Sequence, residues 1–152
     1  VQGNIMSIAN APELSTVVFG TAYPNSSGQV NPGETEYSVW KSTATISNHD
    51  VTLKYLRLRE IGSVNTDDLQ NFNLYVNGTK VAGPVQMGDD YYVVFDLSDN
   101  PVTLQTGNRT IEVKADIIDG SSRNYSFSLR TSADVIVEDS EYGVPVVPTG
   151  LP

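Results

Sequence analysis

Apolar and polar residues alternate along most of this chain, which is the pattern of strands with one buried and one exposed face. The alternation is clearest in four runs, at residues 91–97, 111–117, 125–129 and 135–137. Clusters of Gly, Asn, Asp, Ser and Pro separate these runs and are typical of turns. No window of 11 or more residues repeats its apolar positions at the helical period, so the pattern predicts an all-β protein.

The Asn77-Gly78 pair predicts a tight β-hairpin, because alternating apolar residues lie on both sides of it. A type I′ turn needs positive φ at both central positions, which Asn and Gly tolerate. The expected register pairs Val76 with Thr79, Tyr75 with Lys80 and Leu74 with Val81. This register brings apolar residues together on one face, and the Tyr/Lys pair on the other.

Two longer runs are also expected to be strands. Residues 34–48 form one long strand with Trp40, Ala44 and Ile46 on the same face. Between residues 51 and 61 the apolar positions change from odd to even numbers near Tyr55. A β-bulge near Tyr55 explains the change, and a strand buried on both faces is the alternative.

The two ends of the chain differ from its middle. We expect residues 1–19 to be an extended segment that can donate a strand, and residues 20–33 to be a loop. Residues 34–140 are predicted to form the β-sandwich. The tail at 141–152 is rich in proline, which cannot donate the backbone hydrogen bond of a central strand, so it is a linker or an edge-bound segment.

Composition narrows the classes of partner. The net charge is −9, and the nine Lys and Arg are scattered along the sequence, which argues against nucleic acid and anionic membrane surfaces as partners. The chain has no cysteine, so it has neither disulfides nor thiolate metal sites. No apolar run approaches the 18 residues of a membrane span.

The order of motifs from residue 51 to residue 137 resembles that of Ig-like adhesion modules of prokaryotic surface proteins, the CARDB-type domains and their relatives. Four segments carry the resemblance. They are a strand that ends with residues 58–64, the run Leu74-Tyr-Val-Asn-Gly78, and the strands around residues 95–97 and 111–116. The resemblance implies an Ig-like Greek-key antiparallel β-sandwich in an extracellular setting. It implies no catalytic residues.

Several residues are candidates for modification or binding. Four sequons place N-glycosylation candidates at Asn25, Asn77, Asn108 and Asn124. Acidic groups recur in the turns and could hold a structural calcium ion, although none has the spacing of a known calcium loop. Tyr75 and Tyr92 are expected to point outward on their strands and are the best candidates for stacking on a sugar.

Catalysis is not indicated. Adjacent Asp89 and Asp90 point to opposite sides of a strand, which does not suit the paired carboxylates of a glycosidase. The single histidine, His49, is expected to be a surface residue of a turn, and no metal or nucleophile motif accompanies it. We therefore expect no enzyme and no organic cofactor.

Two functions fit these observations. The first is an extracellular structural subunit of a filament, pilus or surface array, in which each copy donates a strand to the next by donor-strand complementation. The donor residues would be Ile5, Ile8, Leu14, Val17 and Phe19. The second is a carbohydrate-binding or adhesion module of a larger surface protein, with glycans as partners.

Overall fold

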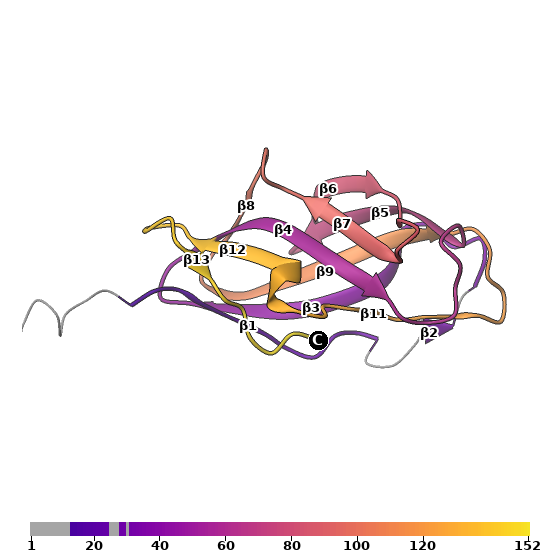
Figure 1. Cartoon of the computed structure of the whole chain (residues 1–152), viewed down its shortest axis with the longest axis horizontal. Coiled ribbons are helices and arrows are strands. Elements are labelled where there is room, and N and C mark those ends of the chain that lie inside the picture. The colour runs from indigo at the N-terminus through magenta and orange to yellow at the C-terminus, as the bar shows by residue number, and fades with distance from the viewer. Residues whose placement is uncertain (1–12, 25–27, 30) are drawn as a thin grey trace, which may run out of the picture.

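Two antiparallel β-sheets lie against each other in the computed structural model, which describes residues 13–24, 28–29 and 31–152 (Figure 1). The prediction of an all-β antiparallel sandwich is confirmed. A short 3-10 helix, η1 (Ser132–Asp134), is the one helical element among the described residues.

The first sheet has five strands in the order β1-β3-β9-β5-β6. Their bounds are β1 (Thr16–Phe19), β3 (Tyr37–Ser47), β9 (Gly107–Ile117), β5 (Leu69–Val76) and β6 (Thr79–Val85). The long strand expected at 34–48 is present as β3, and Trp40, Ala44 and Ile46 are all buried on its inner face. The alternation of β9 likewise buries every second residue from Ile111 to Ile117.

The second sheet is built around the central strand β4 (Val51–Glu60). One edge of β4 pairs with β7 (Tyr92–Asp96) and β8 (Val102–Leu104), and the other with β11 (Phe127–Ser128) and β12 (Val135–Asp139). Strand β13 (Pro145–Val146) pairs with β12. A separate ribbon joins β2 (Gly28–Gln29) to β10 (Asn124–Tyr125).

The bulge expected near Tyr55 is confirmed. Leu53 pairs with Val137 and Tyr55 pairs with Ile136, so Lys54 is the extra residue on β4. The side chains of Leu53 and Leu56 are both fully buried although they differ in parity. The bulge therefore keeps apolar residues facing inward along the whole strand.

The hairpin at Asn77-Gly78 is present with positive φ at both residues. The pairs Val76–Thr79 and Tyr75–Lys80 form as predicted. The predicted pairing of Leu74 with Val81 is wrong, because the register shifts and Leu74 pairs with Ala82. Val81 is an extra residue on β6, and a single bulge of this kind is not visible in a short alternating run.

The proline-rich tail lies along the edge of the sandwich and contacts both sheets. After β13 has paired with β12, the N–H and C=O of Thr149 bond to Val17 and Phe19 in β1. Farther on, the carbonyl of Pro152 accepts the N–H of Leu129. Of the two interpretations of the tail, the edge-bound segment is therefore the one observed, and β1 lies between β3 and the tail.

The core fills the space between the sheets. Phe72 from the first sheet and Phe127 from the second meet edge to face, with ring centroids 5.7 Å apart. Buried aliphatic side chains from β3, β4, β5 and β9 surround them. Burial of this contiguous apolar cluster is the main source of stability in a domain of this size.

Candidate functional site

The outer face of the second sheet carries two exposed side chains, Arg59 and Arg130, and two half-buried ones, Arg57 and Tyr92, which together we call the arginine face. Arg57 and Arg59 lie two residues apart on β4 and so point to the same side of the sheet. Tyr92 pairs directly with Arg59 across β4 and β7. Arg130 follows two residues after Ser128, which pairs with Arg59 from the other edge, so its side chain is also on the outer face.

Arg57 is held in place by a buried carboxylate. Its Nε and Nη2 donate to the same oxygen of Asp134, at 2.8 and 2.6 Å. The other oxygen of Asp134 accepts the backbone N–H groups of Arg130 and Thr131, at 2.7 and 3.0 Å. The hydrogen bond with Asp134 raises the pKa of Arg57 above its already high usual value, so this guanidinium is a fixed positive charge.

The ring of Tyr92 is the aromatic centre of the face. The guanidinium carbon of Arg57 lies 4.4 Å from the ring centroid, and that of Arg59 lies 5.4 Å from it. Both distances are within the range of cation–π attraction. Neither Arg59 nor Arg130 forms an ion pair within the part of the chain that the structure describes, and both are exposed.

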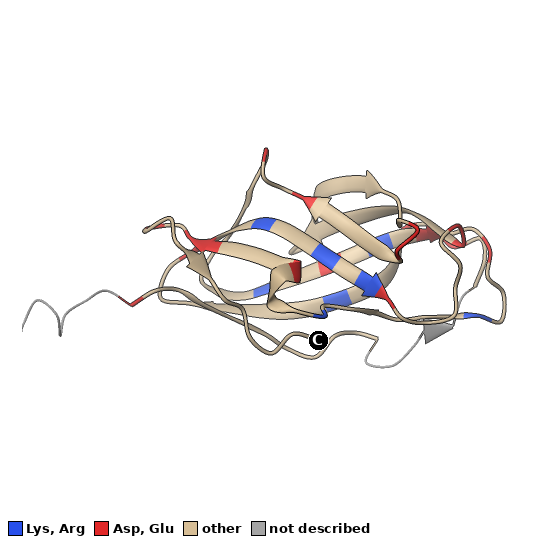
Figure 2. Ribbon diagram, viewed as in Figure 1, with Lys and Arg blue, Asp and Glu red and all other residues tan. Residues whose placement is uncertain are grey.

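Basic side chains gather on this side of a chain that is acidic overall, and two of them, Lys54 and Arg57, are paired with carboxylates. Four of the nine basic residues lie on the outer face of the second sheet: Lys54, Arg57, Arg59 and Arg130. Figure 2 shows three of them in a row along β4. These residues are scattered in the sequence, and the fold brings them onto one sheet face. That nucleic acid and anionic membrane surfaces are not partners stays a prediction.

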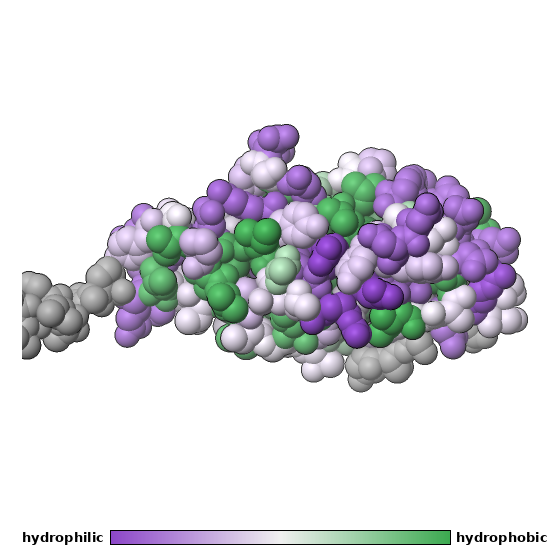
Figure 3. Space-filling model, in the orientation of Figure 1, coloured by the Kyte–Doolittle hydropathy of each residue, from purple (hydrophilic) through white to green (hydrophobic). Residues whose placement is uncertain are grey.

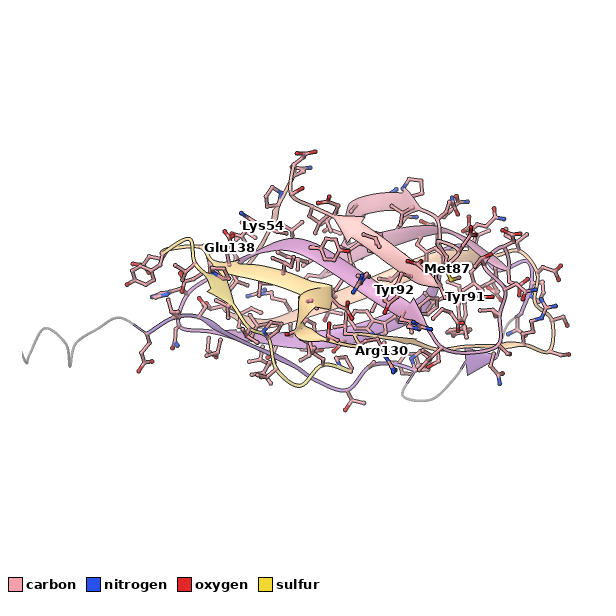
Figure 4. All side chains as sticks on the ribbon, in the orientation of Figure 1. Lys54, Met87, Tyr91, Tyr92, Arg130 and Glu138 are labelled. Atoms are coloured by element: carbon pink, nitrogen blue, oxygen red, sulfur yellow. The ribbon has the colours of Figure 1, made fainter. Side chains whose placement is uncertain are left out.

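The arginine face has definite limits. At one end, Lys54 forms an ion pair of 3.0 Å with Glu138, and Figure 4 shows the two side chains close together across β4 and β12. Beyond β12 lies an apolar groove of about 210 Å³, lined in part by Ile136, Val146 and Val147. Figure 3 shows hydrophilic side chains over the middle of this face with hydrophobic ones beside them.

Of the two tyrosines expected to point outward, only Tyr92 belongs to this open face. Tyr75 is only 8% exposed, so the expectation that it is an open platform for a sugar is wrong. Its hydroxyl donates to Glu36, and the ammonium of Lys114 lies 4.6 Å from its ring centroid. These neighbours cover the ring, and they come from elements distant in sequence, which the local pattern does not reveal.

The strand-donor candidates fall into three groups. Ile5 and Ile8 lie outside the described residues. Leu14 is exposed at the start of the described chain. Val17 and Phe19 are buried in the core of their own sandwich, because β1 pairs with β3 of the same chain. Donation of these two residues to another copy stays a prediction, and it requires β1 to leave its own sheet.

Three of the four glycosylation candidates lie in exposed positions. Asn77 is in the hairpin turn, and its side-chain oxygen accepts the N–H of Thr110. The side-chain oxygen of Asn108 accepts the hydroxyl of Thr45, and Asn124 lies in β10. Asn25 lies outside the described residues. Whether the three exposed asparagines carry glycans stays a prediction.

Residues 13–24, 28–29 and 31–152 contain no cluster of ligands suited to a calcium ion. No three His, Asp or Glu side chains come together there in a way that could hold a metal. The calcium expectation therefore stays a prediction without residues to support it. Over the same residues, no helix is long and apolar enough to cross a membrane.

Sequence reasoning missed the arginine face and the contacts of His49. The spacing Arg57-x-Arg59 in a strand was a usable signal, because it places two cations on one side of the sheet. The contributions of Tyr92 and Arg130 depend on the pairing of three strands and could not be read from the chain. His49 does lie in a turn as expected, but it also contacts Asp139 and Glu141.

Comparisons with known proteins leave the family open. No protein-family model matches the chain, and no curated protein matches it. Membership in the CARDB-type domains therefore stays a prediction. Among solved structures, the chain is similar to a family 35 carbohydrate binding module from Clostridium thermocellum. The two chains are 18% identical, the matched region covers 73% of this chain and 88% of the module, and the TM-score is 0.35.

A second similar structure is CBM35 from Paenibacillus barcinonensis. The two chains are 16% identical, and the TM-score is 0.34. The matched region covers 82% of this chain and 93% of the CBM35 chain. Similarities of this size do not bear on what this chain binds. Only the geometry of the chain itself can therefore indicate its function.

Proposed function

We propose that this chain is a non-enzymatic, extracellular β-sandwich module that binds glycans bearing acidic groups through its arginine face. The observation that carries the proposal is the contact of Arg57 and Arg59 with the Tyr92 ring, with Arg130 on the same sheet face of an acidic chain. Guanidinium groups bind carboxylate and sulfate oxygens with paired hydrogen bonds, and the half-buried Tyr92 ring holds the Arg57 and Arg59 guanidinium groups through cation–π contacts.

The face is prepared for binding before any ligand arrives. Asp134 fixes Arg57, and the Arg57 guanidinium in turn packs on Tyr92, so part of the ordering cost of binding is already met. Arg59 and Arg130 have no carboxylate partner among the described residues, so an anion need not displace one. The rest of the surface is acidic and repels anions, which favours a single binding face.

A glycan panel tests this proposal. The purified chain is applied to heparin oligosaccharides, which carry both carboxylates and sulfates, and to neutral cello- and xylo-oligosaccharides. We expect retention on the acidic members that weakens as salt is raised, because exposed charges are screened over about 8–10 Å at 0.1–0.15 M salt. Equal binding to neutral and acidic sugars, or no binding at all, would contradict the proposal.

We also propose, as a second candidate function, head-to-tail self-association by β-strand addition. The supporting observation is a groove of about 540 Å³ between residues 19–24, 126–128 and 150–152, which runs beside the edge strand β11. Strand β1 borders this groove at Phe19. A strand from a second copy could pair along such an edge, which would build an open fibre.

Removal of residues 1–12 tests the second candidate without removing the buried residues of β1. If the N-terminal segment carrying Ile5 and Ile8 is the donor, the whole chain forms filaments or oligomers, and the shortened chain is a monomer by light scattering and negative-stain microscopy. Filaments formed by the shortened chain would overturn this version. A whole chain that stays monomeric would remove the assembly proposal and leave glycan binding untouched.

A further inference from the structure

A second polar cluster lies at one end of the sandwich, away from the arginine face. We call it the Asp139 clamp and define it as Ser15, His49, Asp139, Glu141 and Tyr142. It joins three segments that are far apart in sequence: the residue before β1, the β3–β4 turn, and the end of β12 with the turn after it. Figure 1 shows the three segments meeting at the same end of the molecule.

Asp139 is the centre of the clamp and is completely buried. One of its oxygens lies 2.8 Å from the donating N–H of Ser15 and 2.9 Å from Nδ1 of His49. The Ser15 hydroxyl oxygen lies 2.9 Å from that Asp139 oxygen and 2.9 Å from the carbonyl oxygen of His49. Its single proton is donated to one of these two acceptors at a time. The other oxygen accepts the N–H groups of Glu141 and Tyr142.

His49 bridges two carboxylates. Its Nδ1 contacts Asp139, and its Nε2 lies 3.0 Å from a carboxylate oxygen of Glu141. A protonated imidazole has two N–H donors and satisfies both contacts, whereas the neutral ring has only one. Because the ring borders a hollow of about 410 Å³ that is open to solvent, it can exchange its proton with water without unfolding of the chain.

We propose that the Asp139 clamp is a pH-dependent latch that holds the start of strand β1 on its own sandwich. With His49 protonated, both carboxylates are bridged and the clamp fixes Ser15 beside Asp139. When His49 loses its proton, one bridge is lost and residues 15–19 separate more often from β3 and the tail. The latch operates whether or not the arginine face binds a glycan.

The three carboxylates near His49 all favour its charged form. Asp139 and Glu141 contact the ring, Asp50 is the adjacent residue of the turn, and the phenol of Tyr142 packs edge to face at 5.3 Å. Ser15, the residue that precedes β1 in the clamp, is uncharged. The hydrogen bond to Asp139 is the main reason that the pKa of His49 is raised, and it outweighs the effect of desolvation.

The direction of the pH effect follows from these shifts. A raised His49 pKa means that the stabilising contact is complete below the unfolded value of about 6.5 and is lost as pH rises through the folded value. Burial alone would raise the pKa of Asp139, but bonds from His49, Ser15 and Tyr142 hold it well below its usual value. Asp139 therefore stays ionised at every pH at which His49 titrates.

Amide hydrogen exchange measured by NMR tests the latch. The exchange rate of residues 16–19 is divided at each pH by the intrinsic rate of the same amides in an unstructured peptide, so that the base catalysis common to all amides cancels. We expect this ratio to rise with pH by about tenfold for each unit by which the folded His49 pKa exceeds its unfolded value. The chain has one histidine, so its proton resonance gives that pKa directly, and both midpoints must agree.

Two variants complete the test. In His49→Gln the exchange ratio should not change between about pH 5.5 and 8.5, since Gln does not titrate in that range. In Glu141→Gln the midpoint should move to lower pH, because one of the two carboxylates is neutral. Glu141 is exposed, so this variant should fold even if the first does not. A flat ratio in the unmodified chain, or the same midpoint in both the unmodified chain and Glu141→Gln, would overturn the proposal.

Discussion

Two buried carboxylates organise the polar contacts of this protein at the scale of single residues. Asp134 fixes Arg57 and the start of η1, and Asp139 fixes the start of β1. Both side chains are completely buried, and the donors around them come from segments up to 124 residues away. Burying a carboxylate is costly unless donors surround it, so the contacts of each one depend on the whole fold being in place.

Asp134→Asn should destabilise the protein by about 2–4 kcal/mol, as measured by urea denaturation. Both oxygens of Asp134 accept hydrogen bonds, so the amide NH₂ of Asn must face either the Arg57 guanidinium or two backbone N–H groups. The matched control is Asp99→Asn, since Asp99 is exposed in a turn. Equal midpoints for the two variants would show that Asp134 has no structural role.

At the scale of elements, the alternating pattern predicted most strands because one face of each strand packs on the core. The bulge in β4 could also be predicted, since the inward-facing positions change parity between Leu53 and Leu56 and one extra residue produces that change. The extra residue in β6 could not, because Val81 and Ala82 are both apolar and either could have paired with Leu74. Short strands such as β10 and β11 carry too few residues for alternation to define their bounds.

Gly83 in β6 gives a test at this scale. Its φ is +107°, and an added Cβ would lie 2.5 Å from the side-chain oxygen of Asn73 and 2.6 Å from the carbonyl oxygen of Phe72. Gly83→Ala should therefore cost about 2 kcal/mol or more in unfolding free energy, measured by urea denaturation. Gly33→Ala is the matched control, because Gly33 has a φ of +101° but no atom near its Cβ position. Equal losses would mean that backbone conformation alone, and not the contact with β5, sets the cost.

At the scale of the whole molecule, the fold brings onto one sheet face basic residues that are far apart in the sequence. The chain has twice as many acidic as basic residues, 18 against 9, yet one sheet face carries Arg57, Arg59 and Arg130 together. The site could be predicted from sequence only in part: Tyr92 was expected to point outward, and the outward side of Arg57 and Arg59 follows from strand periodicity. That Arg130 joins them depends on the pairing of β11 with β4, a contact over about 70 residues of chain.

The most direct measurement of the central claim is the affinity for a heparin hexasaccharide, by isothermal titration calorimetry, of two variants that lose the same charge. Arg59→Gln removes a cation from the arginine face, and Lys80→Gln removes an exposed one from β6 in the other sheet. We predict that Arg59→Gln weakens binding about tenfold, as expected for a lost charge-assisted hydrogen bond of about 1.4 kcal/mol, while Lys80→Gln binds like the unmodified chain. Equal affinities for the two variants would contradict the proposed role of the arginine face.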